Sequence, residues 1–209
     1  VGATGRVWGL DLKQGTEAEF QEIARLRKNC ITIQIVALST GEIVTLNSEG
    51  DLEVLRNTGK ENERETAQLI SPKLTKAPSF VMPLKGGGFI LSRDSREIEI
   101  WKARDTNHGI DYTLNSSLVL SESPSHIEEL PGDRLAIGFP SGLISITSMV
   151  SGKTEELWRC QNDYEVTALK LLSDGTLLVG EGCYRSYMDP AFLHEFKPGE
   201  GPSSTKESI

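Results

Sequence analysis

The sequence predicts an all-β protein built from repeated four-stranded antiparallel sheets. The main observation is a segment that begins with Leu and recurs at spacings of 46, 46 and 42 residues. In each copy, a polar turn that contains Gly or Asp separates two strand-sized apolar stretches, and a third stretch follows within about fifteen residues. The four copies begin at Leu38, Leu84, Leu130 and Leu172.

The first two strands of each copy form a hairpin. The first strand ends at the repeated Leu, and Gly in the turn supplies the positive φ that a tight connection between antiparallel strands requires. The second strand is a nearly continuous apolar run, as at residues 89–91 and 177–179, which is typical of strands covered on both faces. Three residues before each Leu stands another apolar residue, namely Ile35, Val81, Ile127 and Leu169.

The third strand alternates apolar and polar residues, and a weaker outer strand completes each unit. Residues 5–10 are in register with the third strands, so the chain begins inside a repeat. The third strands are expected at residues 52–55, 98–101 and 143–147, and the outer strands near residues 67–70, 118–120 and 156–159. Apart from the outer strand near residues 67–70, residues 57–76 have the composition of a charged loop.

Residues 16–28 do not fit the repeat. Thr16 and Glu19 form a capping box, while Phe20 and Ile23 follow at helical spacing. The sequence favours a short helix here, and an outer strand in the repeat register is the alternative.

A period near 45 residues with four strands per unit is typical of a β-propeller. We expect three full blades plus partial blades in a single domain over residues 1–196, followed by a flexible tail rich in Pro, Gly and Ser at residues 197–209. The units are expected at about residues 1–30 (partial), 31–77, 78–123, 124–163 and 164–196 (partial).

An open array of blades leaves two large apolar faces uncovered. We therefore expect the chain to be a portion of a larger propeller, in agreement with a first residue that is Val rather than Met. Closure at four blades and self-association into a full ring are the alternatives.

Two stretches resemble the WD-repeat family of propellers. Residues 91–101 are similar to its second strand, turn and third strand ending in Trp, and residues 166–175 are similar to its first strand and turn. The resemblance covers about residues 1–182. No Gly-His dipeptide precedes a first strand, and Glu49, Ser95 and Ser141 stand where the family has its turn Asp. The resemblance therefore implies that the His–Asp network of typical blades is absent.

Charge and cysteine content exclude several classes of protein. The net charge of −8 argues against nucleic acid or an anionic membrane surface as the main partner. The apolar runs are strand-sized, so no membrane span is expected. Cys30, Cys160 and Cys183 are odd in number, far apart and without a Cys-x-x-Cys pair, which favours a reducing cytoplasmic location.

No reactive residues converge in the sequence. His108, His126 and His194 occupy unrelated repeat positions, so we predict neither a catalytic nor a metal site. The glycines at 86–88 lack a following helix and are expected in a hairpin turn rather than around a phosphate. We predict no cofactor.

The predicted binding residues lie at the tip that follows each second strand, where the repeat is kept but the residue varies. Arg and Phe are enriched at binding hot spots. The alternative to a role in binding is a structural one. The Arg would then form hydrogen bonds within its turn, and the Phe would pack against the neighbouring blade. These residues are Asn47, Arg93, Phe139 and Glu181.

The function expected from these features and from the resemblance is a non-enzymatic scaffold that binds a protein or peptide. Further propeller repeats or a second copy are expected as partners in completing the ring. A propeller hydrolase or lactonase with a channel metal is an alternative, although the apolar inner-strand positions disfavour it. A substrate-receptor subunit in ubiquitin ligation is a third possibility that rests on family analogy alone.

Overall fold

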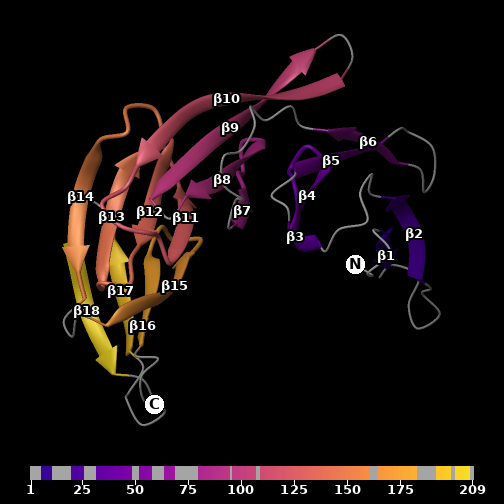
Figure 1. Ribbon diagram of the computed structural model, residues 1–209. Helices are drawn as coiled ribbons and strands as arrows, with labels where there is room; N and C mark the ends of the chain where they lie inside the picture. Colours follow the sequence, from indigo (N-terminus) through magenta and orange to yellow (C-terminus); the bar gives the residue numbers. More distant parts are fainter. Residues whose placement is uncertain are drawn as a thin grey trace. The chain divides into compact units, whose positions relative to one another are not determined.

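Antiparallel β-sheets make up the described part of the chain in a computed structural model (Figure 1). Among the described residues there is no helix that could cross a membrane. The structure describes residues 6–10, 20–25, 32–48, 52–57, 64–68, 80–94, 96–106, 109–160, 164–182, 192–198 and 201–207.

Four of the sheets have four strands each, and in every one the strands are neighbours in chain order. Sheet 1 holds β3 (Thr32–Ala37), β4 (Ile43–Asn47), β5 (Leu52–Asn57) and β6 (Arg64–Gln68). Sheet 2 holds β7 (Phe80–Pro83), β8 (Gly88–Asp94), β9 (Glu97–Thr106) and β10 (Gly109–Val119). Sheet 3 holds β11 (His126–Leu130), β12 (Arg134–Gly138), β13 (Leu143–Ser148) and β14 (Thr154–Arg159). Sheet 4 holds β15 (Glu165–Leu171), β16 (Leu177–Gly182), β17 (Phe192–Lys197) and β18 (Gly201–Glu207).

The predicted fold class is confirmed, with one correction at the C-terminal end. Sheets 1 to 3 match the three full blades, but the last unit is a complete sheet rather than a partial one. Strand β18 pairs with β17, so the flexible tail predicted at residues 197–209 is wrong over Gly201–Glu207. An outer strand needs no apolar alternation, because one edge and much of its side-chain surface face water, and it therefore leaves little signal in the sequence.

The N-terminal region requires a second correction. Strands β1 (Arg6–Leu10) and β2 (Phe20–Arg25) form a two-stranded sheet, with Leu10 opposite Phe20. The helix favoured for residues 16–28 is therefore wrong over Phe20–Arg25, where the alternative of an outer strand holds. Pairing with β1 supplies backbone hydrogen bonds that outweigh a local helical preference worth a few tenths of a kcal/mol per residue.

The chain divides into two compact units. Unit 1 comprises Val1–Asp94 with Ile98–Asn115, and unit 2 comprises Ser95–Glu97 with Ser116–Ile209. The predicted single domain over residues 1–196 stays a prediction.

The core of unit 1 lies between sheets 1 and 2. Trp101 stacks on Phe89 with ring centroids 6.0 Å apart, and Tyr112 meets Phe89 at 5.4 Å. These rings pack with buried aliphatic side chains of β4 and β5, so a single cluster joins the two sheets. The aliphatic members include Val44, Leu46, Leu52 and Val54.

The core of unit 2 lies between sheets 3 and 4. Trp158 of β14 stacks on Phe196 of β17, with ring centroids 4.8 Å apart, so this Trp packs between the two sheets. Gly138 allows the sheets to approach closely, since a Cβ there would lie 2.4 Å from Val166 Cγ1. The remaining contacts come from aliphatic side chains of both sheets, among them Ala136, Ile144, Ile146, Leu169 and Val179.

Three of the repeated Leu residues begin the same hairpin turn. In each, the Leu N–H donates to the carbonyl four residues later, and the Gly N–H three residues on donates back to the Leu carbonyl. These turns begin at Leu38, Leu84 and Leu172, and Gly41, Gly87 and Gly175 have positive φ in them. The glycines at 86–88 thus lie in the expected hairpin turn.

We expect Gly88→Ala to lower the free energy of unfolding by roughly 2–4 kcal/mol. Gly88 has a φ of 108°, and a Cβ there would lie 2.2 Å from the Trp101 carbonyl oxygen. Gly86→Ala is the matched control, because a Cβ at Gly86 meets nothing within 4 Å. Urea denaturation followed by Trp fluorescence measures both, and equal midpoints for the two variants would contradict the prediction.

A buried hydrogen-bonded network joins sheets 1 and 2 inside unit 1. The carboxylate of Glu42 accepts from the Thr40 hydroxyl and from the Tyr112 hydroxyl, at 2.5 Å in each case. Burial, followed by the bond to Glu42, raises the pKa of Tyr112 well above its ordinary value. The phenol is thus held in its neutral, proton-donating form.

Tyr112→Phe is expected to cost about 1–3 kcal/mol at neutral pH, since Glu42 loses a donor while staying buried. In the native protein, stability is fully present below the ordinary Tyr pKa of about 10 and falls above it, because the unfolded chain loses the phenolic proton first. Urea midpoints measured from pH 8 to pH 11 should therefore fall less steeply in the variant. Parallel pH profiles for the two proteins would refute this role of the phenol.

Candidate functional site

The structure buries three of the four residues predicted to bind a partner. Asn47 is 6% exposed, Phe139 2% and Glu181 1%. Arg93 lies in β8, with its side chain outside the described residues. Phe139 and Glu181 belong to the same unit but have different neighbours. The predicted role of the four residues in binding stays a prediction.

Phe139 lines an open groove on one face of sheet 3 in unit 2. The walls are formed by β13, β14 and the segment that leaves β10. The groove combines apolar side chains with hydroxyl groups, and none of the described residues that line it is charged. The residues that line it include Leu118, Val119, Leu157, Ser145, Thr147 and Thr154.

The alternation of β13 produces this groove. Ile144 and Ile146 face sheet 4 and are fully buried in the core. Leu143, Ser145 and Thr147 are on the opposite face, where short side chains leave space. The sequence predicted the alternation, but not the segment that crosses this face.

Hydrogen bonds hold the end of β10 and the residue that follows it in place. Leu120 N–H donates to the Arg96 carbonyl at 2.7 Å, and the Ser116 hydroxyl donates to the Met149 carbonyl at 2.9 Å. Leu118 packs close to Gly152, where a Cβ would meet Leu118 Cδ2 at 3.1 Å. One wall of the groove is therefore fixed by backbone contacts.

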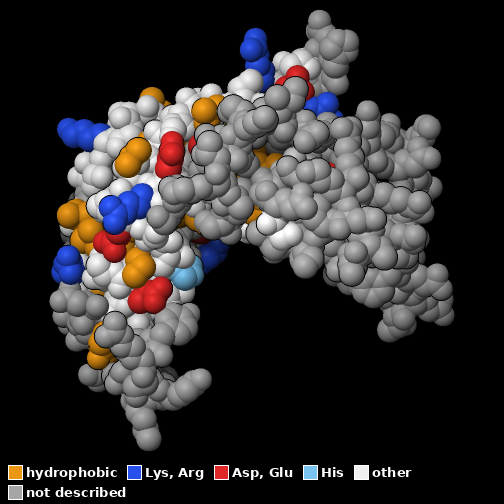
Figure 2. Space-filling view, viewed as in Figure 1, with side chains coloured by type: hydrophobic (Ala, Val, Ile, Leu, Met, Phe, Trp, Pro, Cys, Tyr) orange, Lys and Arg blue, Asp and Glu red, His pale blue; other side chains and the backbone are white. Residues whose placement is uncertain are grey.

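The rim of the groove exposes apolar side chains to solvent. Val119 is 82% exposed and Leu157 is 60% exposed. Figure 2 shows that elsewhere on the visible face hydrophobic side chains lie scattered among charged ones of both signs. Two exposed aliphatic side chains beside apolar and hydroxyl-bearing lining residues make this surface of unit 2 suited to an apolar ligand.

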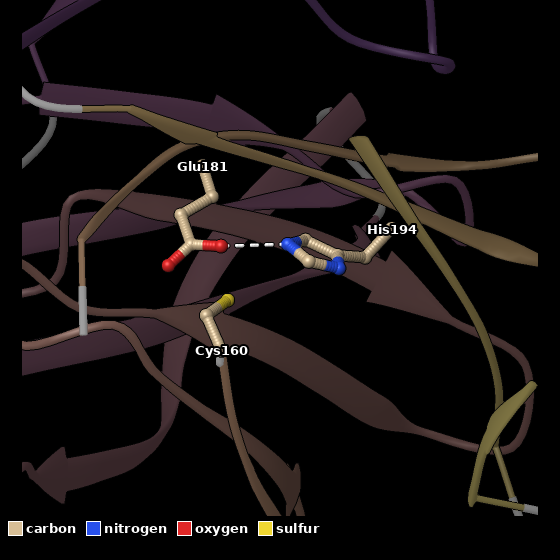
Figure 3. Close-up of side chains that lie close together, drawn as sticks. All are labelled: Cys160, Glu181 and His194. Carbon is tan, nitrogen blue, oxygen red and sulfur yellow. Dashed lines mark hydrogen bonds and ion pairs between the residues drawn. The ribbon is translucent and has the colours of Figure 1, made fainter. Parts of the chain in front are cut away.

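Glu181 belongs to a second constellation, which lies in the interior of unit 2 (Figure 3). The Glu181 carboxylate and His194 Nε2 are 2.6 Å apart, and the sulfur of Cys160 points toward both groups. One ligand atom from each of the three residues lies within 4.8 Å of the other two. All three side chains are buried.

The elements of sheets 3 and 4 bring these residues together. Glu181 is in β16, opposite Phe192 of the adjacent β17, and His194 lies two residues further along β17, on the same side of that strand as Phe192. Cys160 directly follows β14. Sequence reasoning missed Cys160 and His194 because no motif spacing connects them. A His–carboxylate bond thus occurs in this chain, at positions that the resemblance to WD repeats did not indicate.

The other two histidines have separate surroundings, in agreement with their unrelated repeat positions. His126 is partly buried, and its Nδ1 lies 3.1 Å from the Val166 carbonyl oxygen. This contact links sheet 3 to sheet 4. His108 is outside the described residues.

Comparison with known proteins shows the fold alone. No protein-family model matches the sequence, and no curated protein matches it. Among solved structures, a chain in the crystal structure of a mitotic checkpoint complex has a TM-score of 0.67 at 13% sequence identity. The match covers 97% of this chain and 58% of that one. With the repeated four-stranded sheets, it confirms the predicted propeller-type fold.

We expect Glu181→Ala to lower the free energy of unfolding by about 2–4 kcal/mol. The substitution removes the acceptor of both His194 and the Tyr164 N–H, and it leaves the imidazole buried. Glu155→Ala, at a half-exposed position 4.0 Å from Arg134, should change stability by less than about 0.5 kcal/mol.

The pairing itself is tested by a double-mutant cycle with His194→Ala. Because the two side chains contact each other directly, the losses should be non-additive by about 1 kcal/mol or more. Additive losses in urea denaturation would show that Glu181 and His194 act independently.

Proposed function

We propose that the chain is a non-enzymatic protein–protein interaction scaffold built on WD-like repeats, and that the groove on sheet 3 binds an extended peptide segment of a partner protein. The observation that carries this proposal is the groove itself. It is open, uncharged and rimmed by two exposed aliphatic side chains, Val119 and Leu157.

The lining of the groove defines the chemistry of the ligand. Leu118, Phe139 and Leu143 offer an apolar floor and walls, which suit an aliphatic or aromatic side chain. The hydroxyls of Ser121 and Thr154 can exchange hydrogen bonds with a peptide backbone. A charged side chain finds no partner in the lining, so the preferred segment is uncharged. Among the predicted binding residues whose side chains the structure describes, Phe139 alone lines the groove.

The fold comparison supports a scaffold in general terms. The similar solved chain belongs to a protein complex, and this chain spans 58% of its length. Propeller sheets hold their loops and faces on a rigid frame, which suits recognition of protein segments. The complete protein is proposed to act together with further propeller repeats or with a second copy of the chain.

A hydrolase is the second candidate, favoured by the proximity of Cys160, His194 and Glu181. A thiol, an imidazole and a carboxylate are the parts of a nucleophile–base–orienting triad. The three side chains are 3%, 4% and 1% exposed, and none of them lines the groove. A substrate would not reach the sulfur in this arrangement, so the scaffold proposal is preferred.

The proposal predicts that uncharged apolar peptides bind at the groove. Peptides selected from a displayed random library against the purified chain can be labelled with fluorescein and titrated by fluorescence anisotropy. Val119→Asp and Leu157→Asp should each weaken binding at least about tenfold, roughly 1.4 kcal/mol, because they place a charge at an apolar contact.

Val150→Asp is the matched control, since Val150 is 69% exposed but does not line the groove. This variant should bind the peptides as the native chain does. Equal affinity of all three variants, or a library that yields no binding peptide, would refute the groove as the binding site. Turnover of an ester or lactone by the native chain, lost in Cys160→Ser, would favour the hydrolase instead.

A further inference from the structure

The buried constellation of Cys160, Glu181 and His194 offers three different ligand types to one point. A thiol sulfur, an imidazole nitrogen and a carboxylate oxygen lie within 4.8 Å of one another. Their side chains converge in Figure 3, with the sulfur directed at the hydrogen-bonded pair. Neither the groove on sheet 3 nor the proposed peptide contact uses these residues.

The donor set selects the class of metal. Zinc accepts sulfur, imidazole nitrogen and carboxylate oxygen together, whereas calcium and magnesium prefer oxygen ligands alone. A thiolate and a carboxylate carry two negative charges, which neutralise a divalent cation. This balance matters because a net charge is costly in an interior site where all three side chains are less than 5% exposed.

The ligand atoms of Glu181 and His194 need to move only a short distance apart to coordinate an ion. In tetrahedral coordination, bond lengths of about 2.0–2.3 Å place ligand atoms about 3.4–3.6 Å apart. His194 Nε2 and Glu181 Oε2, now 2.6 Å apart, would separate by less than about 1 Å as the ion replaces their hydrogen bond. Cys160 Sγ, which lies within 4.8 Å of both atoms, would approach them by up to about 1.4 Å.

The surroundings already orient two of the ligands. The second carboxylate oxygen of Glu181 accepts the backbone N–H of Tyr164 at 3.1 Å. The His194 ring lies between Phe192 and Phe196, with centroid distances of 6.4 and 6.1 Å. Such neighbours fix the direction of ligand atoms and limit the access of water, as they do around known metal sites.

We propose that Cys160, Glu181 and His194 bind a zinc ion that connects sheet 3 to sheet 4. Cys160 comes from the end of sheet 3, and the other two ligands come from sheet 4. Ion binding releases the thiol proton of Cys160 to solvent. The proton of the Glu181–His194 hydrogen bond also leaves Nε2 and Oε2, so that the imidazole binds the ion as the neutral tautomer protonated on Nδ1 and two metal–ligand bonds replace the hydrogen bond. The ion stabilises the folded unit because the unfolded chain does not hold the three ligands together.

Cobalt(II) is the probe, since its bond to thiolate gives a charge-transfer band in the near ultraviolet. Titration of the reduced chain with cobalt(II) should saturate this band at one ion per chain, and zinc should abolish it. Cys160→Ser should lose the band, whereas Cys30→Ser should keep it. The thermal midpoint of the native chain should rise with zinc concentration, and that of Cys160→Ser should not.

A measurement on the native chain alone makes the test independent of the folding of the variants. X-ray absorption of the zinc-loaded protein should show one sulfur and two or more nitrogen or oxygen ligands per ion. A folded native chain without a thiolate band, a band that persists in Cys160→Ser, or zinc bound by nitrogen and oxygen only would each overturn the proposal. None of these outcomes bears on peptide binding at the groove.

Discussion

Packing of an apolar face of each four-stranded sheet against its neighbour in the same unit is the constraint on which the rest of the structure depends. In unit 2, Ile144 and Ile146 of sheet 3 are fully buried against sheet 4, and burying each such side chain is worth roughly 1.5–3 kcal/mol. Close approach requires Gly138, where a Cβ would collide with Val166. The repeat is thus the sequence pattern of a sheet that is stable only beside its neighbours.

Several polar groups inside these contacts form hydrogen bonds from one sheet to the next, and these bonds fix how the two sheets lie on each other. In unit 1, the Gln34 amide forms two 2.7 Å bonds with the backbone of Val81, which joins sheet 1 to sheet 2. In unit 2, Ser125 Oγ and His126 Nδ1 both contact the Val166 carbonyl. Apolar contacts alone would allow one sheet to slide over the other, whereas hydrogen bonds form only when the two sheets are correctly aligned.

The groove and the Cys160–Glu181–His194 cluster both depend on how the two faces of sheet 3 are packed. On one face of sheet 3, short side chains such as Ser145 and Thr147 leave space, and the result is a groove with an apolar rim. On the other face, packing against sheet 4 is close enough to bring Cys160 to Glu181 and His194. Binding of a peptide and binding of an ion are therefore proposed for separate places in one unit, where each can be lost without the other.

The sequence by itself determined the strand order, the hairpin turns and the apolar faces, because these depend on residues close together in the chain. Only the tertiary structure decided that Phe20–Arg25 is a strand, that Gly201–Glu207 completes sheet 4 and that Phe139 lines a groove. It alone brought Cys160 to His194, since their strands meet through contacts between sheets. Edge pairing and packing between sheets join residues far apart in the chain, and such contacts leave no local pattern to read.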